Sequence, residues 1–229
     1  MSVPRWKILL EQAIESHSKS TVIQLASIDP TTPVPHVRSL IFRGFLSAQD
    51  NPARPLLLAT TDVRTPKTAQ MIANPHVQIA WWIDGSQEQY RIAGKAHVVP
   101  APGHTLHKHF MHTIVPLGSA NFDWEAKRID VFNSMSPVMK ASWCRPTPGS
   151  RLEGGEEEAK KWPVKIEEPK PGDEEGKRLW EMSLSHFALV VIEPDSVDYV
   201  ELKPIPNRRT SFWPSKTSRG VWEEEALVP

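Results

Sequence analysis

The chain has 229 residues, 39% of them hydrophobic, enough to bury a substantial core in one large domain or two small ones. Lys plus Arg and Asp plus Glu number 27 each, so no net charge attracts nucleic acid or an anionic membrane. A single cysteine excludes an internal disulfide, and neither a signal-peptide block nor a run of roughly 18 apolar residues is present. We expect a soluble cytoplasmic protein, with a nuclear location left open, that acts on a small molecule.

The first third of the chain predicts a helix followed by strands. Apolar residues recur at helical spacing from Trp6 to Ile14, which indicates an amphipathic helix. Residues 21–27 and 37–45 read as strands, and the two prolines of residues 29–33 predict the turn of a hairpin between them. The apolar run 56–59 predicts a buried strand.

The middle of the chain continues the strand pattern. Residues 77–83 are strongly apolar, and from Gln89 to Val99 apolar and polar residues alternate with a period of two. Short turns and one short helix connect these strands. This pattern favours an antiparallel barrel with helices on its outside.

The second half is less regular. Residues 104–114 and 124–134 predict helices, whereas Pro146–Gly176 is rich in proline, glycine and mixed charge and predicts a long surface loop. Residues 187–192 and 197–202 predict the last strands. We expect these strands to complete the sheet, so that residues 1–229 form a single domain.

The stretch from Thr60 to Gln70 is the strongest candidate for a binding site. It follows the buried strand and opens a helix that is expected to end near Asn74, with Thr65 as N-cap and Pro66 at the first helical position. Arg64, the Thr65 hydroxyl, Lys67 and the free N–H groups of the first turn would converge on a small volume. Such a helix start predicts a phosphate site.

Three other features could join this site. Arg38 and Arg43 lie five residues apart on one predicted strand, so they face opposite sides unless a bulge or the strand end redirects one of them. Gln89 offers donors and an acceptor suited to the edge of a heterocycle. Arg209, near the C-terminus, is suited to bidentate recognition of phosphate or carbonyl groups.

These residues, in this order, resemble the FMN-binding split-barrel family that includes pyridoxamine 5′-phosphate oxidase, and within it a branch of oxidase-like flavoproteins whose reactions are mostly unassigned. The similarity covers the chain from Trp6 to Pro229, apart from the predicted loop. It is carried by four segments: Arg38-Ser39-Leu40-Ile41-Phe42-Arg43; Thr61 with Arg64-Thr65-Pro66-Lys67, Gln70 and Asn74-Pro75; residues 89–96; and the tail with Arg209 and Trp222.

The resemblance implies a mainly β (α+β) fold, a six-stranded antiparallel split β-barrel with peripheral helices, and FMN as cofactor. It implies that Arg38, Arg64, Thr65 and Lys67 hold the FMN phosphate, with Thr60 and Thr61 in the same turn. The strand with Ser39, Leu40 and Arg43 would lie along the isoalloxazine ring. Gln89 and Arg209 would meet ring heteroatoms from the second subunit of a homodimer with FMN at its interface.

The sequence departs from the family where the oxidases bind their substrate. Their Arg-Pro-x-x-Ser-Gln-x-Gly stretch is absent from residues 104–119, where we place the corresponding region, and Ile205 and Asn207 replace an Arg-x-His pair. FMN binding therefore carries over, but pyridoxamine phosphate as the substrate does not. We expect an FMN-dependent oxidoreductase; a true pyridoxamine or pyridoxine 5′-phosphate oxidase, a non-catalytic flavin-binding module and a barrel without cofactor are the alternatives.

Four histidines within residues 104–112 form pairs at helical spacing that could face a metal ion: His104, His107, His109 and His112. No cysteine lies nearby, so a polar helix face is the favoured interpretation and no metal is expected. A histidine that lines the flavin pocket and supplies a proton is the third interpretation.

Overall fold

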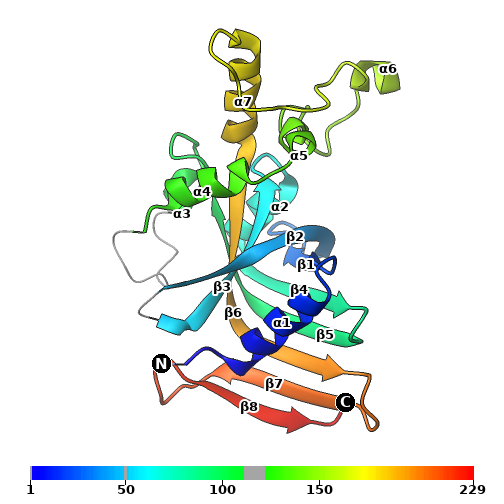
Figure 1. Cartoon of the computed structure of the whole chain (residues 1–229), viewed down its shortest axis with the longest axis vertical. Coiled ribbons are helices and arrows are strands. Elements are labelled where there is room, and N and C mark those ends of the chain that lie inside the picture. The colour runs from blue at the N-terminus through cyan, green and yellow to red at the C-terminus, as the bar shows by residue number, and fades with distance from the viewer. Residues whose placement is uncertain (1, 49–50, 111–121) are drawn as a thin grey trace.

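The structure, a computed structural model, describes residues 2–48, 51–110 and 122–229, and in them six strands close into a ring (Figure 1). Their order is β3-β2-β1-β4-β5-β6, and β6 pairs back with β3. Strands β7 and β8 continue the sheet beyond β6, and all neighbours are antiparallel. The bounds are β1 (Val22–Ile28), β2 (Pro35–Ala48), β3 (Asn51–Asp62), β4 (His76–Ile83), β5 (Glu88–Val99), β6 (Phe187–Glu201), β7 (Arg208–Pro214) and β8 (Trp222–Leu227). This six-strand ring confirms the expected fold class.

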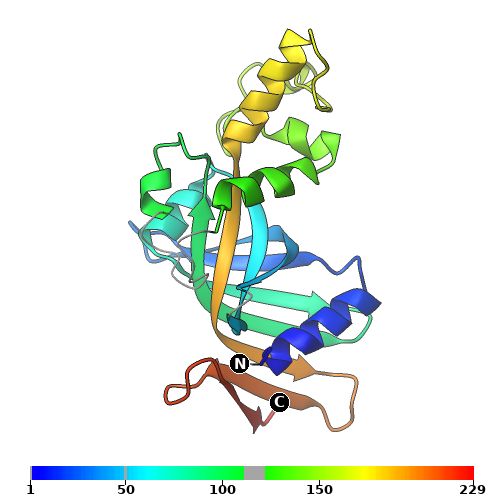
Figure 2. The ribbon, with the colours of Figure 1, turned by 60° about the vertical axis from the view of Figure 1, so that its left-hand side comes forward.

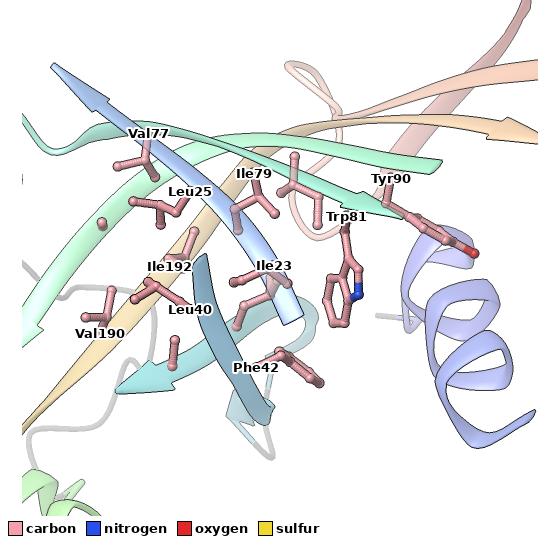
Figure 3. Packing of buried hydrophobic residues seen from close by; sticks show 14 of the residues in the cluster. Ile23, Leu25, Leu40, Phe42, Val77, Ile79, Trp81, Tyr90, Val190 and Ile192 are labelled. Atoms are coloured by element: carbon pink, nitrogen blue, oxygen red, sulfur yellow. The ribbon is translucent and has the colours of Figure 1, made fainter. Parts of the chain in front are cut away.

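The inside of the ring is the main hydrophobic core. Alternate residues of each strand point inward, as the period of two predicts, and Figure 3 shows them meeting between the strands. Helix α1 (Arg5–Ser16), which was predicted from its apolar spacing, covers one opening with Trp6 and Leu10, both fully buried. The indole of Trp6 packs edge-on against Trp222 of β8, with ring centroids 5.4 Å apart.

A second core lies outside the ring, where helices cover β3 and β6. Outward residues of these strands, Leu56, Leu58 and Val191 among them, pack with Phe132 and Trp143 from the helical segment. Figures 1 and 2 show these helices gathered at the end of the ring opposite β7 and β8. The helices beyond α1 are α2 (Pro66–Ala73), α3 (His107–Phe110), α4 (Trp124–Asn133), α5 (Pro137–Ser142), α6 (Gly155–Ala159) and α7 (Glu174–His186).

The prediction of two separate last strands is wrong, because residues 187–201 form one strand. Pro194 does not end β6, because it lies at a bulge opposite Ala93 and Gly94 of β5. A side chain on Gly94 would collide with the carbonyl of Glu193, so glycine allows the two strands to approach closely there.

Several elements were not predicted. They include helix α7 and strands β7 and β8. Helix α3 is shorter than the predicted helix 104–114, whose last four residues lie outside the described ranges. Between residues 146 and 173 the chain is irregular apart from α6, and α7 then begins at Glu174. Every helix in the described ranges is too short or too polar to span a lipid bilayer.

Candidate functional site

A pocket of about 940 Å³ lies between the ring and the helical segment. Its floor is formed by β2, the end of β3 and the start of α2, and its opposite side by α5 and the irregular chain after it. Ligand pockets hold drug-sized molecules in roughly 300–1,000 Å³, so this pocket has room for a cofactor with a small substrate beside it. It is lined by Ser39, Leu40, Ile41, Arg43, Thr60, Thr61, Asp62, Thr65, Lys67, Met139, Ser142, Trp143, residues 145–153, Glu158 and Trp162.

Strand β2 presents its outward residues to the pocket. Leu40 and Phe42 face the core, so Ser39, Ile41 and Arg43 face the other way. Arg43 is the extra residue of a bulge between Phe42 and Gly44, and Gly44 takes a positive φ of 134° there. The buried Nε of Arg43 has no hydrogen-bond partner within the described ranges, and burial lowers the pKa of this guanidinium. A buried donor of this kind is a candidate contact for a ligand oxygen.

The turn between β3 and α2 supplies the polar end of the pocket. The backbone places Thr65 at the N-cap position and Pro66 at the first helical position, as predicted, and the helix ends at Ala73. The Thr65 hydroxyl does not cap the helix, however. It donates to the carbonyl of Asp62 at 2.8 Å, and the hydroxyl of Thr61 donates to the same oxygen at 3.1 Å. These threonines therefore fix the shape of the turn from which Lys67 projects.

Lys67 carries the positive charge that this turn presents to the pocket. It lines the pocket half-buried and has no ion-pair partner within residues 2–48, 51–110 and 122–229. Its pKa lies below the usual value because burial disfavours the charged ammonium and because Arg38 adds a second positive charge nearby; Asp62 acts in the opposite direction. An anion in the pocket would relieve both effects. Together with the positive end of the α2 dipole, Lys67 is therefore a candidate for binding a phosphate group.

Arg64 lies outside the pocket lining, because its guanidinium is already occupied. It donates to both carboxylate oxygens of Asp62, with distances of 3.0 and 2.7 Å, and to the carbonyl of Arg145 at 3.0 Å. The predicted convergence of Arg64 with Lys67 on a phosphate is not seen in this arrangement. Asp62, two residues earlier, was not considered as a partner in the sequence. Its carboxylate and the Arg145 carbonyl hold the Arg64 side chain on the side of the helical segment.

We expect Arg64→Gln to lower protein stability more than cofactor affinity. Asp62 has 8% of its side chain exposed, so removing its cation leaves a carboxylate without its charged partner. The free energy of unfolding should fall by about 2–3 kcal/mol in urea denaturation. Arg178→Gln, at an exposed ion pair with Glu175, is the control and should change stability little. Unchanged stability together with much weaker FMN binding would contradict this prediction and would indicate that Arg64 binds the FMN phosphate.

Arg38 also lies outside the pocket lining. It sits on the core-facing side of β2, opposite Leu25, and its guanidinium donates to the Ser27 hydroxyl at 2.6 Å and to the Gln70 side-chain oxygen at 2.9 Å. Arg38 and Arg43 therefore face opposite sides of the strand, as alternation requires, and only Arg43 reaches the pocket. Arg38 acts on the site through its charge on Lys67.

Gln89 and Arg209 lie on either side of β6 and do not line the pocket. Both pair with Val200 of β6, so they share one row of the sheet. Arg209 is held by the carboxylate of Asp198 in two hydrogen bonds of 2.9 and 2.8 Å. From β2 to β5 the sheet runs across three strand spacings, or about 14 Å. Gln89 and the pocket floor are thus separated within one chain.

The side of the pocket opposite the ring was not predicted. It comes from α5 and residues 145–153, whereas the sequence analysis placed the substrate-binding region at residues 104–119. Residues 146–153 belong to the predicted surface loop, because their prolines, glycines and charges lack periodicity. Its two arginines, Arg145 and Arg151, were the available signal.

The three described histidines of the cluster, His104, His107 and His109, do not line this pocket. His104 lies before α3 and His107 is its first residue. The Nδ1 of His104 accepts a hydrogen bond from the backbone N–H of Leu106. The pKa of His104 lies below its usual value because of burial and the nearby His186. In the part of the chain that the structure describes, no three metal-ligating side chains come together, and His112 lies outside that part.

Cys144 follows the pocket residue Trp143 but is not a pocket-lining residue. Its thiol donates to the carbonyl of Leu179 at 3.1 Å, and burial raises its pKa. A thiol held in this way is a poor nucleophile at neutral pH. This supports the structural interpretation of the single cysteine.

Comparisons with known proteins agree with this geometry. Residues 3–100 match the family model described as pyridoxamine 5′-phosphate oxidase, FMN-binding domain. A pyridoxine/pyridoxamine 5′-phosphate oxidase 2 from Arabidopsis thaliana is 29% identical over 232 residues, covering 99% of this chain and 98% of the relative.

Two solved structures share the fold. A pyridoxamine 5′-phosphate oxidase-related, FMN binding protein from Nostoc punctiforme has a TM-score of 0.72 at 24% identity, with 100% of both chains covered. PhzG from Burkholderia lata, in complex with tetrahydrophenazine-1-carboxylic acid, has a TM-score of 0.63 at 12% identity, covering 100% of this chain and 94% of that one. These likenesses support the split-barrel fold.

Proposed function

We propose that this chain is a homodimeric FMN-dependent oxidoreductase that acts on a small molecule, because residues 3–100 match an FMN-binding domain model and nearly the whole chain is similar to a pyridoxine/pyridoxamine 5′-phosphate oxidase. The observation that carries the proposal is Lys67, a half-buried cation without an ion-pair partner in the described part of the chain, at a helix start inside a pocket large enough for a flavin. FMN, when bound, supplies electron transfer; the protein supplies binding, orientation and electrostatics.

The residues of the pocket fit this cofactor. Lys67 and the start of α2 would hold the phosphate, with Thr60, Thr61 and Thr65 shaping the turn around it. The outward face of β2 at Ser39, with the adjoining Leu40, would lie along the ring. The cationic Arg43 beside this strand would favour the anionic form of a reduced ring system.

A second copy of the chain would complete the site. Gln89 and Arg209 lie too far across the sheet from the β2 floor to contact the same flavin in one chain. The outward face of β1 and β2 carries exposed apolar residues next to the pocket: Val22 is 42% exposed and Val37 is 66% exposed. Val37 lies two residues before Ser39, on the same face of β2. We therefore infer that this face joins two copies, and that each contributes Gln89 and Arg209 to the other's flavin.

Oxidation of pyridoxamine or pyridoxine 5′-phosphate is the second candidate activity. It is favoured by the similarity, over nearly the whole chain, to the Arabidopsis thaliana pyridoxine/pyridoxamine 5′-phosphate oxidase 2. Against it stand the two sequence departures, the absent Arg-Pro-x-x-Ser-Gln-x-Gly stretch and the replaced Arg-x-His pair. In place of that pair, Ile205 is 97% exposed, and the Asn207 amide donates to the carbonyl of Leu202.

A visible spectrum of the purified full chain tests the proposal. We expect a yellow protein, or one that takes up added FMN in a one-to-one ratio, whose flavin is bleached by a reduced nicotinamide donor or by its substrate and recovers in air. Accumulation of pyridoxal 5′-phosphate from pyridoxamine 5′-phosphate would establish the second candidate. A colourless protein that ignores added FMN would overturn the proposal, and bound flavin without any redox turnover would reduce the protein to a flavin-binding module.

A further inference from the structure

Residues 145–153, which we term the pocket wall, close the side of the pocket opposite β2. Most of the wall is exposed and it contains neither helix nor strand, but Arg145 at its base is half-buried. The wall starts two residues after Trp143, whose buried indole packs edge-on against Phe187 with ring centroids 4.9 Å apart. The wall therefore has a fixed base on the second core.

Two side chains from other elements tie this base to the ring. Arg64, braced by Asp62, donates to the carbonyls of Trp143 at 3.4 Å and Arg145 at 3.0 Å. The Nδ1 of His186, at the end of α7, lies 2.7 Å from the Trp143 carbonyl oxygen. Because a carbonyl oxygen can only accept a hydrogen bond, Nδ1 carries the proton and donates it. These contacts hold the backbone of Arg145, which leaves its side chain free to face the pocket.

Arg145 is a cationic group on the wall side of the pocket and has no ion-pair partner in the described residues. Of the three lining carboxylates, Asp62 is paired with Arg64 and Glu158 with Lys161 at 2.7 Å. The third, Glu153, lies on the wall together with two arginines, Arg145 and Arg151. The Nε of Arg145 is buried without a hydrogen-bond partner within the described ranges, as is that of Arg43 on the opposing strand. Native proteins leave few buried donors unpaired, so two in one pocket point to an acceptor that binds there.

Lys67 and the α2 helix start already form one anion site, on a different element from Arg145. The pocket volume is at the upper end of the range for a single ligand, which leaves space beside a cofactor. We infer that Arg145 binds the anionic group, a carboxylate or a phosphate, of the substrate, and that Arg64 is the positioning residue that holds Arg145 over the pocket. This inference rests on the proposed function and names the substrate class of the same site.

Titration of the FMN-loaded full chain with benzoate, phenyl phosphate and the neutral analogue benzamide tests the inference, with the flavin absorption band as readout. At least one of the two anions should perturb the band and bind at least roughly tenfold more tightly than benzamide, since a charge-assisted contact exceeds a neutral one. The preferred anion distinguishes a carboxylate substrate from a phosphate substrate. Arg145→Gln should weaken that anion roughly tenfold, and Arg145→Lys should restore much of the affinity.

Two controls separate this inference from the proposed function. Arg178→Gln removes an equally charged but exposed side chain of α7 and should bind the anions like the unaltered protein. FMN affinity, measured for every variant by fluorescence quenching, should stay within about threefold in Arg145→Gln. Equal binding of anions and benzamide, anion binding that ignores Arg145→Gln, or a loss of FMN instead of the anion would each overturn the inference. Failure of the unaltered chain to take up FMN would instead overturn the proposed function.

Discussion

Replacing Lys67 by alanine is expected to weaken FMN binding by roughly 10- to 150-fold, since a hydrogen bond to a charged group contributes about 1.5–3 kcal/mol. Lys67 lines the pocket without an ion-pair partner in the described part of the chain, so its ammonium has no competing contact to give up. The fall in its pKa caused by burial and by Arg38 is a cost that a bound phosphate would remove. Fluorescence quenching of FMN on titration with protein measures the affinity.

The variants around Lys67 separate phosphate binding from general damage. Lys67→Arg keeps the charge and should retain most of the affinity. Lys203→Ala removes an exposed lysine from the segment between β6 and β7 and should behave like the unaltered protein. Riboflavin, which lacks the phosphate, should bind equally to Lys67→Ala and to the unaltered protein. If Lys67→Ala lost riboflavin and FMN alike, the phosphate would lie elsewhere.

Placing aspartates on the outward face of β1 and β2 is expected to abolish both dimer and bound flavin. In the proposed homodimer, Val22→Asp/Val37→Asp would put four carboxylates into an apolar interface, where desolvation of each charge is strongly unfavourable. The monomer would then lack the partner's Gln89 and Arg209. We expect sedimentation equilibrium to show a monomer, and FMN affinity to fall roughly 100-fold or more as two polar contacts and the cover of the ring are lost.

Val164→Asp is the matched control, because Val164 is 71% exposed and lies on the irregular chain between α6 and α7. It should leave association and flavin affinity unchanged. Circular dichroism should show the same secondary structure in both variants, because Val22 and Val37 point away from the core. A double variant that stays dimeric, or a monomer that binds FMN with full affinity, would contradict the proposed interface.

The elements with a strong period were predictable from the sequence. Helix α1 and most strands of the ring up to β5 have alternating or helical apolar spacing, and each predicted segment lies within an element. Strand β3, however, extends from Asn51 to Asp62 around the predicted run 56–59. The helix start at Thr65 and Pro66 was also recognisable, because capping preferences act over a few neighbouring residues. Helix α7, which follows the proline- and charge-rich segment, and β8, which carries three consecutive glutamates, were not predicted. They pack against the second core and the rest of the sheet, respectively.

In the candidate site, too, some residues are placed by local sequence and others by tertiary contacts. Residues whose position follows from one strand or one turn, such as Ser39, Thr65 and Lys67, line the pocket, and their contact with FMN stays a prediction. Arg64 and Arg38 were expected at the same phosphate, but each has a neighbour that attracts it elsewhere: Asp62 and the wall carbonyls for Arg64, and Ser27 with Gln70 for Arg38. A sequence shows that an arginine is present but not which of several partners its long side chain will reach.

The sequence by itself predicted the strands of the ring up to β5, the helix start at Thr65 and Pro66 and, through the family resemblance, the cofactor class, because these depend on local periodicity, capping and motif order. Only the tertiary structure decided what faces the cofactor site. Residues 145–153 reach the pocket from nearly a hundred residues away, and the contacts that hold them, from Arg64 and His186, join segments far apart in the chain. Such long-range contacts form when the two cores pack, so no local pattern records them.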